Sequence, residues 1–182
     1  MRLFIAIDFD KNIKAYLENI EAELKNYCNK GSFTSIDNFH ITLAFLGELE
    51  ESTVSGVIKA MENSASKFTP FLLTFDKIGN FNKGNSNILW MGTSYSEKLT
   101  SLHKKLCINL KKEGIDYDEK PLKPHITIGR QVILNKEIIE IANSLNLDHQ
   151  MKILINSITL MESKRINRKL TYVPLAEVSL KY

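Results

Sequence analysis

The stretch FHITLAFLG, residues 39–47, has a shorter counterpart in PHITIGR, residues 124–130. Each copy holds a histidine, an apolar residue, a threonine and a second apolar residue, and 85 positions (125 − 40) separate His40 from His125. β-Branched and aromatic residues in a short apolar run are typical of a β-strand. Side chains alternate between the two faces of a strand, so the histidine and threonine point one way and the apolar residues the other. Each copy therefore predicts a strand with one buried face and an imidazole and a hydroxyl on the other.

The chain has 182 residues, of which 43% are hydrophobic and 25% are charged. This composition is that of an ordinary soluble globular protein, and the length suits one domain, or two small lobes built as one unit. The net charge of +3 decides little by itself. Basic residues gather at two places, Lys104 to Lys123 and Lys164 to Lys169. Such a cluster is most often a solvated face, with nucleic acid or phosphate as the alternative.

Cys28 and Cys107 lie far apart, without the spacing of metal ligands, in stretches that we expect to be helical. Buried free thiols suit them better than a disulfide, and free thiols fit a reducing cytosol. The apolar opening at residues 3–7 is too short for a signal peptide and stops at Asp8. No apolar run approaches the roughly 20 residues that span a bilayer. We therefore expect a cytoplasmic protein without a membrane partner.

The rest of the chain alternates between strand patterns and helix patterns. Strands are expected at residues 2–8, 71–75, 88–92, 152–163 and 172–180. Helices are expected after Asp10, Ser52, Ser96 and Asn135. The run at 79–87 is rich in Gly and Asn and predicts an exposed, mobile loop. One motif recurring in two comparable halves suggests an internal duplication.

Only two of the four histidines begin a predicted strand. His103 lies in a predicted helix beside a stripe of leucines, and His149 lies in a polar segment, so a boundary role and a surface role suit them. A metal site at His40 and His125 would need nearby cysteine or carboxylate ligands, which the motifs lack. A Ser-His-Asp hydrolase would need a Gly-x-Ser-x-Gly turn, which the sequence also lacks.

Acid–base catalysis on a phosphoester suits the two motifs better. Histidine titrates near neutral pH, so one imidazole can accept a proton while its twin donates one. The hydroxyls of Thr42 and Thr127 can donate hydrogen bonds to phosphate oxygens. This chemistry needs no metal and no cofactor. For one copy alone, a chance His-x-Thr in a strand is the simpler explanation, because threonine is common in strands.

With these two motifs the chain resembles the two-histidine phosphoesterase superfamily, and within it the RNA 2′,3′-cyclic phosphodiesterases, once described as 2′-5′ RNA ligases. The likeness extends to the opening MRLFIAID, to ILWMG at 88–92, and to Glu162-Ser163 before a late Tyr172. It implies an α+β, bilobal fold, with two pseudo-symmetric antiparallel sheets and outer helices around a central cleft. Residues 1–182 would form a single two-lobed phosphoesterase domain with internal duplication.

The same resemblance implies hydrolysis of an RNA terminal 2′,3′-cyclic phosphate to a 2′-phosphate. His125 would take a proton from water, His40 would give one to the departing 3′ oxygen, and Thr42 and Thr127 would hold the phosphate. In reverse, the same groups would ligate RNA through a 2′-5′ bond. We expect the partner to be RNA with a cyclic phosphate end and the chain to be a monomer. The alternatives are a non-catalytic module that binds RNA ends, or a related enzyme acting on 2′-5′ linkages or a cyclic nucleotide.

Arg130 and Phe45 are the two further candidates, for binding phosphate and for stacking a base. The family resembled often carries arginine at the position of Arg130, where a guanidinium would bind phosphate through paired hydrogen bonds. Strict alternation turns Arg130 away from His125, so it reaches the cleft only if a bulge, which Gly129 would permit, re-aims it. Phe45 and the loop around Phe81 are candidates for stacking a base. Alternation, however, places Phe45 on the core face.

Overall fold

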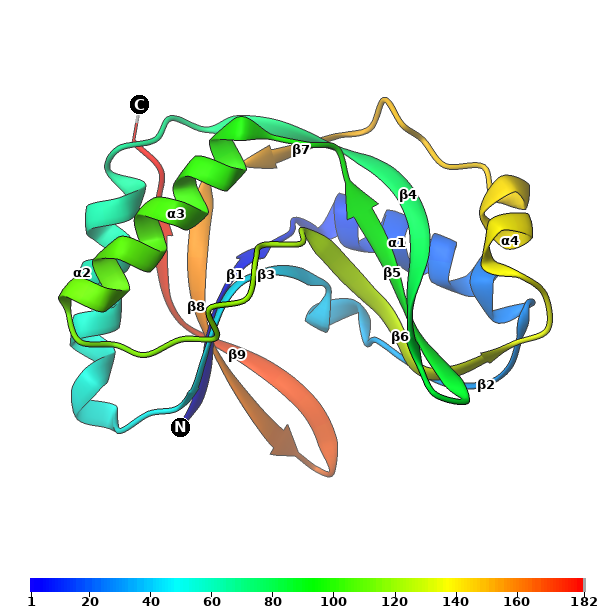
Figure 1. Ribbon diagram of the computed structural model, residues 1–182, viewed down its shortest axis with the longest axis horizontal. Coiled ribbons are helices and arrows are strands. Elements are labelled where there is room, and N and C mark those ends of the chain that lie inside the picture. The colour runs from blue at the N-terminus through cyan, green and yellow to red at the C-terminus, as the bar shows by residue number, and fades with distance from the viewer. Residues whose placement is uncertain (182) are drawn as a thin grey trace.

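The computed structural model describes residues 1–181, and within them one antiparallel sheet of nine strands curls between two pairs of helices (Figure 1). The strands are β1 (Arg2–Asp8), β2 (Cys28–Phe33), β3 (His40–Glu48), β4 (Phe71–Lys83), β5 (Ser86–Thr93), β6 (His125–Leu134), β7 (Lys152–Ile155), β8 (Ser157–Ile166) and β9 (Lys169–Ser179). The helices are α1 (Lys11–Lys25), α2 (Val54–Ala65), α3 (Glu97–Lys112) and α4 (Ile138–Ser144). Short 3₁₀ turns at Ile36–Asn38 and Glu51–Thr53 precede β3 and α2.

The strand order is symmetric about the junction of β3 and β6. The order runs β7-β4-β5-β6-β3-β1-β8-β9, with β2 also paired to β6. Read outward from the junction, one lobe is β3-β1-β8-β9 and the other is β6-β5-β4-β7. The pairs β3/β6, β1/β5, β8/β4, α1/α3 and α2/α4 each begin 84 to 86 positions apart in the chain. The predicted α+β fold with two pseudo-symmetric antiparallel halves is therefore confirmed, and the pairing of Ile41 with Ile126 joins the two halves into one sheet.

Helices cover the outer face of each lobe. In Figure 1, α2 and α3 lie together beside β8 and β9, whereas α1 and α4 lie over β2, β4 and β6. Two of the predicted helix starts carry their caps. The Asp10 side chain accepts hydrogen bonds from the backbone N–H groups of Asn12 and Ile13, and Ser96 accepts one from Leu99. Such caps satisfy N–H groups that the first helical turn leaves free.

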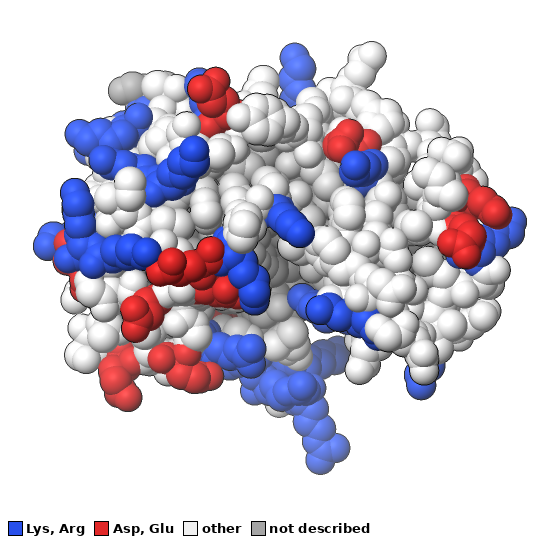
Figure 2. Space-filling model, viewed as in Figure 1, with Lys and Arg blue, Asp and Glu red and all other residues white. Residues whose placement is uncertain are grey.

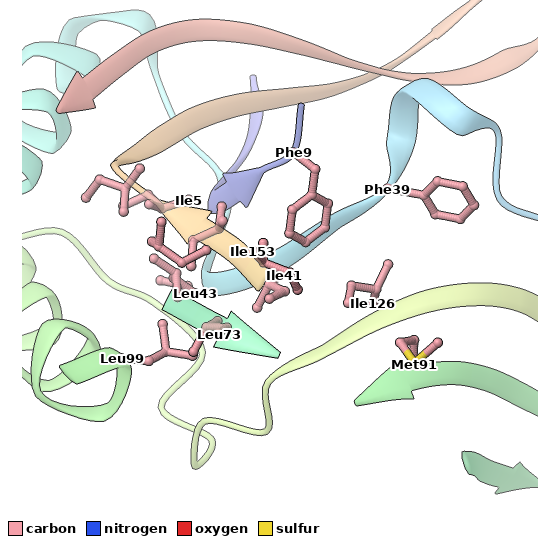
Figure 3. Close-up of a cluster of buried hydrophobic side chains, with 14 of the residues drawn as sticks. Ile5, Phe9, Phe39, Ile41, Leu43, Leu73, Met91, Leu99, Ile126 and Ile153 are labelled. Carbon is pink, nitrogen blue, oxygen red and sulfur yellow. The ribbon is translucent and has the colours of Figure 1, made fainter. Parts of the chain in front are cut away.

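The core fixes which way the two motifs face. Ile41 and Ile126 are fully buried, and Figure 3 shows them in a cluster with Leu73, Met91 and Leu99 from other elements. A shift of one residue in either strand would turn these isoleucines to solvent and the histidines into the core. Burial of the apolar face thus forces the imidazoles and hydroxyls to the opposite face.

Three sequence predictions were wrong about local structure. The helix after Asp10 ends at Lys25, and Cys28 begins a strand because β2 pairs with β6. Residues 79–87 are a paired hairpin of β4 and β5, closed by Lys83 opposite Ser86, with Gly84 at a φ of +65°. The single strand expected at 152–163 is broken at Asn156 into β7 and β8, which pair with β4 and β1.

Other predictions about individual residues hold. Both cysteines are free thiols as predicted, although each is half-buried rather than buried. His149 is exposed, and His103 is half-buried on α3, with its Nε2 atom 3.4 Å from Cys107 Sγ. Among residues 1–181, none of the helices combines the length and apolarity that crossing a membrane requires.

Candidate active site

All five residues predicted for the site line one cavity of about 700 Å³ between the lobes. His40 and Thr42 reach it from β3, and His125, Thr127 and Arg130 reach it from β6. Figure 2 shows the face of the molecule hollowed near its centre, with Lys and Arg side chains around the hollow. The geometry on which the two-motif hypothesis depends is therefore present.

The register of the junction explains how the two motifs share this cavity. Ile41 lies opposite Ile126 in an antiparallel pair. One residue to either side, this register brings His40 toward Thr127 and Thr42 toward His125. Because all four side chains leave the same face, the site contains two imidazoles and two hydroxyls related by the pseudo-two-fold axis.

Hydrogen bonds define the tautomer of both imidazoles. His40 Nδ1 lies 2.7 Å from the carbonyl oxygen of Asn38, and His125 Nδ1 lies 2.6 Å from that of Lys123. A carbonyl oxygen only accepts, so Nδ1 carries a proton in each ring and donates it. In the neutral imidazole the Nε2 atom is then a free acceptor. The Thr42 hydroxyl, 2.9 Å from His40 Nε2, donates to it.

Aromatic rings hold both imidazoles from the side. The rings of Phe4 and Tyr172 each have their centroid 5.0 Å from that of His40, and Tyr172 is edge-on to the imidazole at 89°. Phe81 lies edge-on to His125 at 5.2 Å and 90°, and Trp90 lies 6.5 Å away. Edge-to-face contacts restrict how an imidazole can rotate. Both imidazoles are therefore held in one orientation by the rings around them.

Burial lowers the pKa of both histidines. For His40, burial is the largest cause, opposed by the Asn38 carbonyl and by the charge of Asp8, while Arg130 and His125 lower the pKa further. For His125, burial again comes first; the Lys123 carbonyl opposes it, and the positive charges of Arg130 and Lys123 add to it. Both imidazoles are thus biased toward the neutral form, which is the form that accepts a proton at Nε2.

A β-bulge at equivalent positions in β3 and β6 determines whether the Arg130 side chain faces the cavity. The pairing of β6 with β5 passes over Ile128, so Ile128 and Gly129 both face the core and Arg130 turns to the cavity. The pairing of β3 with β1 passes over Leu43 in the same way. Such an extra residue re-aims every side chain that follows it.

The bulge in β3 makes the prediction for Phe45 wrong. Leu43 and Ala44 are both buried, and Phe45 is 54% exposed and lines the cavity rather than the core. Phe45 and Arg130 each stand five residues after a histidine, so they occupy equivalent positions in the two lobes. The pseudo-symmetric site therefore presents an aromatic ring on one side and a cation on the other.

Sequence reasoning missed Asn38, which is 7% exposed and lies beneath His40. Its side-chain N–H donates to the Leu170 carbonyl at 2.9 Å, and its side-chain oxygen accepts from the Tyr172 N–H at 3.2 Å. The amide thus ties β9 to the turn whose carbonyl orients His40. A polar residue two before the motif histidine was the only available signal, and it could equally mark an exposed turn.

The fold and the site together define a class: two-lobed proteins in which two neighbouring His-x-Thr strands, one from each lobe, direct their side chains into one cleft. A family model described as the 2′-5′ RNA ligase superfamily matches residues 16–167. The chain is 34% identical over 142 residues to an Archaeoglobus fulgidus protein named RNA 2′,3′-cyclic phosphodiesterase, covering 78% of each. It is 33% identical over 131 residues to a Thermotoga maritima protein of the same name, covering 71% of this chain and 70% of the relative. The chain belongs to the 2′-5′ RNA ligase superfamily.

Solved structures agree with this fold over the whole length. A Thermus thermophilus protein superposes with a TM-score of 0.83 at 21% identity, covering 99% of this chain and 98% of that one. Escherichia coli LigT in its apo form superposes with a TM-score of 0.78 at 25% identity, covering 100% of this chain and 98% of that one.

Proposed function

We propose that this chain hydrolyses the terminal 2′,3′-cyclic phosphate of RNA to a 2′-phosphate, by acid–base catalysis between His40 and His125 and without a metal. One observation carries the proposal. Two imidazoles with the same tautomer reach one cavity from strands related by a pseudo-two-fold axis. Family membership and the shared name of the curated relatives support the choice of substrate.

The reaction needs one proton removed and one delivered. Water attacks phosphorus while His125 Nε2 takes its proton, and the bond from phosphorus to the ribose 3′ oxygen breaks as protonated His40 Nε2 gives its proton to that oxygen. The product keeps its phosphate on the 2′ oxygen, and the two histidines have exchanged protonation states. With a ribose 5′-hydroxyl in place of water, the same transfers would form a 2′-5′ linkage.

The local charges support this division of roles. Arg130 lowers the pKa of both histidines, but only His40 has a carboxylate, Asp8, that raises its pKa, and only His125 has the charge of Lys123 that lowers it. Burial opposes protonation of both, and the anionic phosphate that enters the cavity offsets it by raising the pKa of a nearby imidazole. We therefore assign this proton to His40, the imidazole whose pKa Asp8 raises. His125, whose pKa no carboxylate raises, is then the neutral imidazole and the base.

The remaining residues act on the phosphate itself. The Arg130 guanidinium can pair with two of its oxygens, and the hydroxyls of Thr42 and Thr127 can donate to them as charge moves during the reaction. Residues from both lobes of the chain line the cavity, and we propose that the chain acts as a monomer.

The test is product analysis on a dinucleotide ending in a 2′,3′-cyclic phosphate, with EDTA present throughout. We expect a 2′-monophosphate, identified by phosphorus NMR, and a bell-shaped dependence of kcat/KM on pH. Loss of activity on chelation would contradict the metal-free mechanism, and a flat profile from about pH 5 to 9 would contradict paired acid and base. Binding of the substrate without turnover would favour the non-catalytic alternative.

A further inference from the structure

The hairpin of β8 and β9 extends beyond the body of the molecule (Figure 1). Its pairing continues to Ile166 opposite Lys169, and Asn167 and Arg168 form the turn. Both turn residues have positive φ, 50° and 66°. Two such residues make a type I′ turn, whose twist matches that of a hairpin, so the tip has a preset conformation. Residues 163–172 are called the basic arm below.

One face of the basic arm continues the wall of the catalytic cavity. Ser163 lies opposite Tyr172 and Arg165 lies opposite Leu170, so these four side chains share a face, and all four line the cavity. Tyr172 is in edge contact with His40, and Leu170 follows roughly 7 Å further out along the strand. The face therefore leads outward from one catalytic imidazole toward Arg168 at the tip.

The arm is basic, and most of its charge is not neutralised within the molecule. It carries Lys164, Arg165, Arg168 and Lys169. Lys164 pairs with Glu162 at 2.6 Å, while the other three make no ion pair among residues 1–181. Figure 2 shows Lys and Arg side chains, without red neighbours, at the lower end of the view where Figure 1 places this tip.

The charged residues that line the cavity beneath the arm are also mostly positive. Arg2 and Arg130 line it together with Lys164 and Arg165, against the single carboxylate of Asp118, which pairs with Lys120 at 2.7 Å. The opposite hairpin differs. Its tip between β4 and β5 contains Lys83, Gly84, Asn85 and Ser86, and so carries one cation. An extended anion that leaves the cavity is therefore attracted to one side only.

We propose that the basic arm binds the phosphodiester backbone of the nucleotides on the 5′ side of the terminal cyclic phosphate, so that the enzyme prefers an oligonucleotide to a mononucleotide. This inference rests on the proposed function and adds its substrate class. Each upstream nucleotide carries one phosphate charge that Arg165, on this face, or Arg168, at the tip, can neutralise. Leu170, 43% exposed between these cations, offers apolar surface to a ribose or base.

The experiment compares kcat/KM for a 2′,3′-cyclic mononucleotide with that for di-, tetra- and octanucleotides that end in the same cyclic phosphate. We expect kcat/KM to rise at least tenfold from the mononucleotide to the tetranucleotide and then to level off. We also expect a steeper loss of kcat/KM with added salt for the longer substrates, since each phosphate contact on a single strand adds about 0.7 to the slope of log K against log salt.

Arg168→Gly tests the arm without endangering the fold. It converts the turn to Asn-Gly, the sequence that a type I′ turn favours, while removing the guanidinium. We expect a several-fold lower kcat/KM for the octanucleotide, a salt slope smaller by about 0.7, and an unchanged rate on the mononucleotide, because Arg168 does not line the cavity. Arg168→Lys should keep most of the preference. Lys83→Ala, at the tip of the opposite hairpin, removes one charge and should leave the preference intact.

The outcomes separate the two proposals. Hydrolysis at equal kcat/KM for all lengths, or a preference that Arg168→Gly leaves unchanged, would overturn the role of the arm alone. An equal loss in Lys83→Ala would overturn it too, because net charge rather than the arm would then be responsible. Failure to hydrolyse any of the four substrates would overturn the proposed function, and this inference with it.

Discussion

The two motif strands begin with the same His-Ile-Thr but differ in the residues that follow and in their surroundings. His40 lies above a buried amide, Asn38, that is hydrogen-bonded to β9, while His125 donates its orienting hydrogen bond to the carbonyl of exposed Lys123. The fifth residue after each histidine is a phenylalanine on one side and an arginine on the other. A symmetric backbone thus supports an asymmetric site, and an asymmetric site is what separates an acid from a base.

The largest effect on this pair of strands is expected from removing either imidazole. His40→Ala and His125→Ala should each lower the single-turnover rate on a cyclic-phosphate dinucleotide by about 10²- to 10⁴-fold, the range for one general acid or base. The double variant should lose little more, because the two groups act as a unit. His149→Ala, which alters an exposed histidine outside the cavity, is the control. Near-normal rates in either single variant would refute a shared role.

Substitutions of Arg130 and Phe45, each five residues after a motif histidine, should affect different kinetic constants. Arg130→Gln removes hydrogen bonds from a charged donor, each worth about 1.5–3 kcal/mol, and should reduce kcat/KM by roughly ten- to a hundredfold. Phe45→Leu keeps an apolar surface but removes an aromatic face, so we expect a higher KM with little change in kcat. Steady-state kinetics on the same dinucleotide distinguish the two patterns. Equal effects on kcat in both variants would mean that the bulges do not divide phosphate binding from base binding.

The residues whose carbonyls orient the two imidazoles, Asn38 and Lys123, should differ in their effect on the free energy of unfolding. Asn38→Ala leaves the Leu170 carbonyl and the Tyr172 N–H without their partner, which should cost about 1–3 kcal/mol of the free energy of unfolding. Lys123→Ala keeps the carbonyl that His125 uses and alters only an exposed side chain, so stability should change by less than about 0.5 kcal/mol. Urea denaturation checks both values. A stable Asn38→Ala variant would show that β9 does not depend on the amide.

The two histidines should differ least in how they make the free energy of unfolding depend on pH. Burial lowers the pKa of His40 and His125 below 6.5 in the folded protein, so the unfolded chain binds more protons just below that pH. The free energy of unfolding should therefore fall as the pH drops from 6.5 through the folded pKa values and should level off above 6.5. His40→Gln and His125→Gln should each flatten this slope, measured by urea denaturation between about pH 5 and 7.5. His103, whose pKa burial also lowers, acts in the same direction and is left in place as a common background.

Local pattern predicted much of the fold because the patterns concerned were strong. The leucine stripe of α3, with Ser96 before it, predicted its start correctly. The hairpin at 79–87 could not be predicted in the same way, since its Gly and Asn residues are those of a loop, and only pairing with β5 makes them a strand. Asn156, where β7 gives way to β8, interrupts a run that is continuously strand-like in sequence, because the two halves pair with different strands.

The paired His-x-Thr motifs and the faces of their strands follow from the residues themselves, because a period of two and a buried apolar face leave one orientation open. Three features of the site follow from tertiary contacts instead: the imidazoles share a cavity, Asn38 supports one of them, and Phe45 and Arg130 face inward. The last of these depends on the bulges, which arise from a mismatch in register with the neighbouring strands β1 and β5. The residue that follows the unpaired position is Ala44 in one bulge and Gly129 in the other. Since the two residue types differ, the sequence at this position does not predict a bulge.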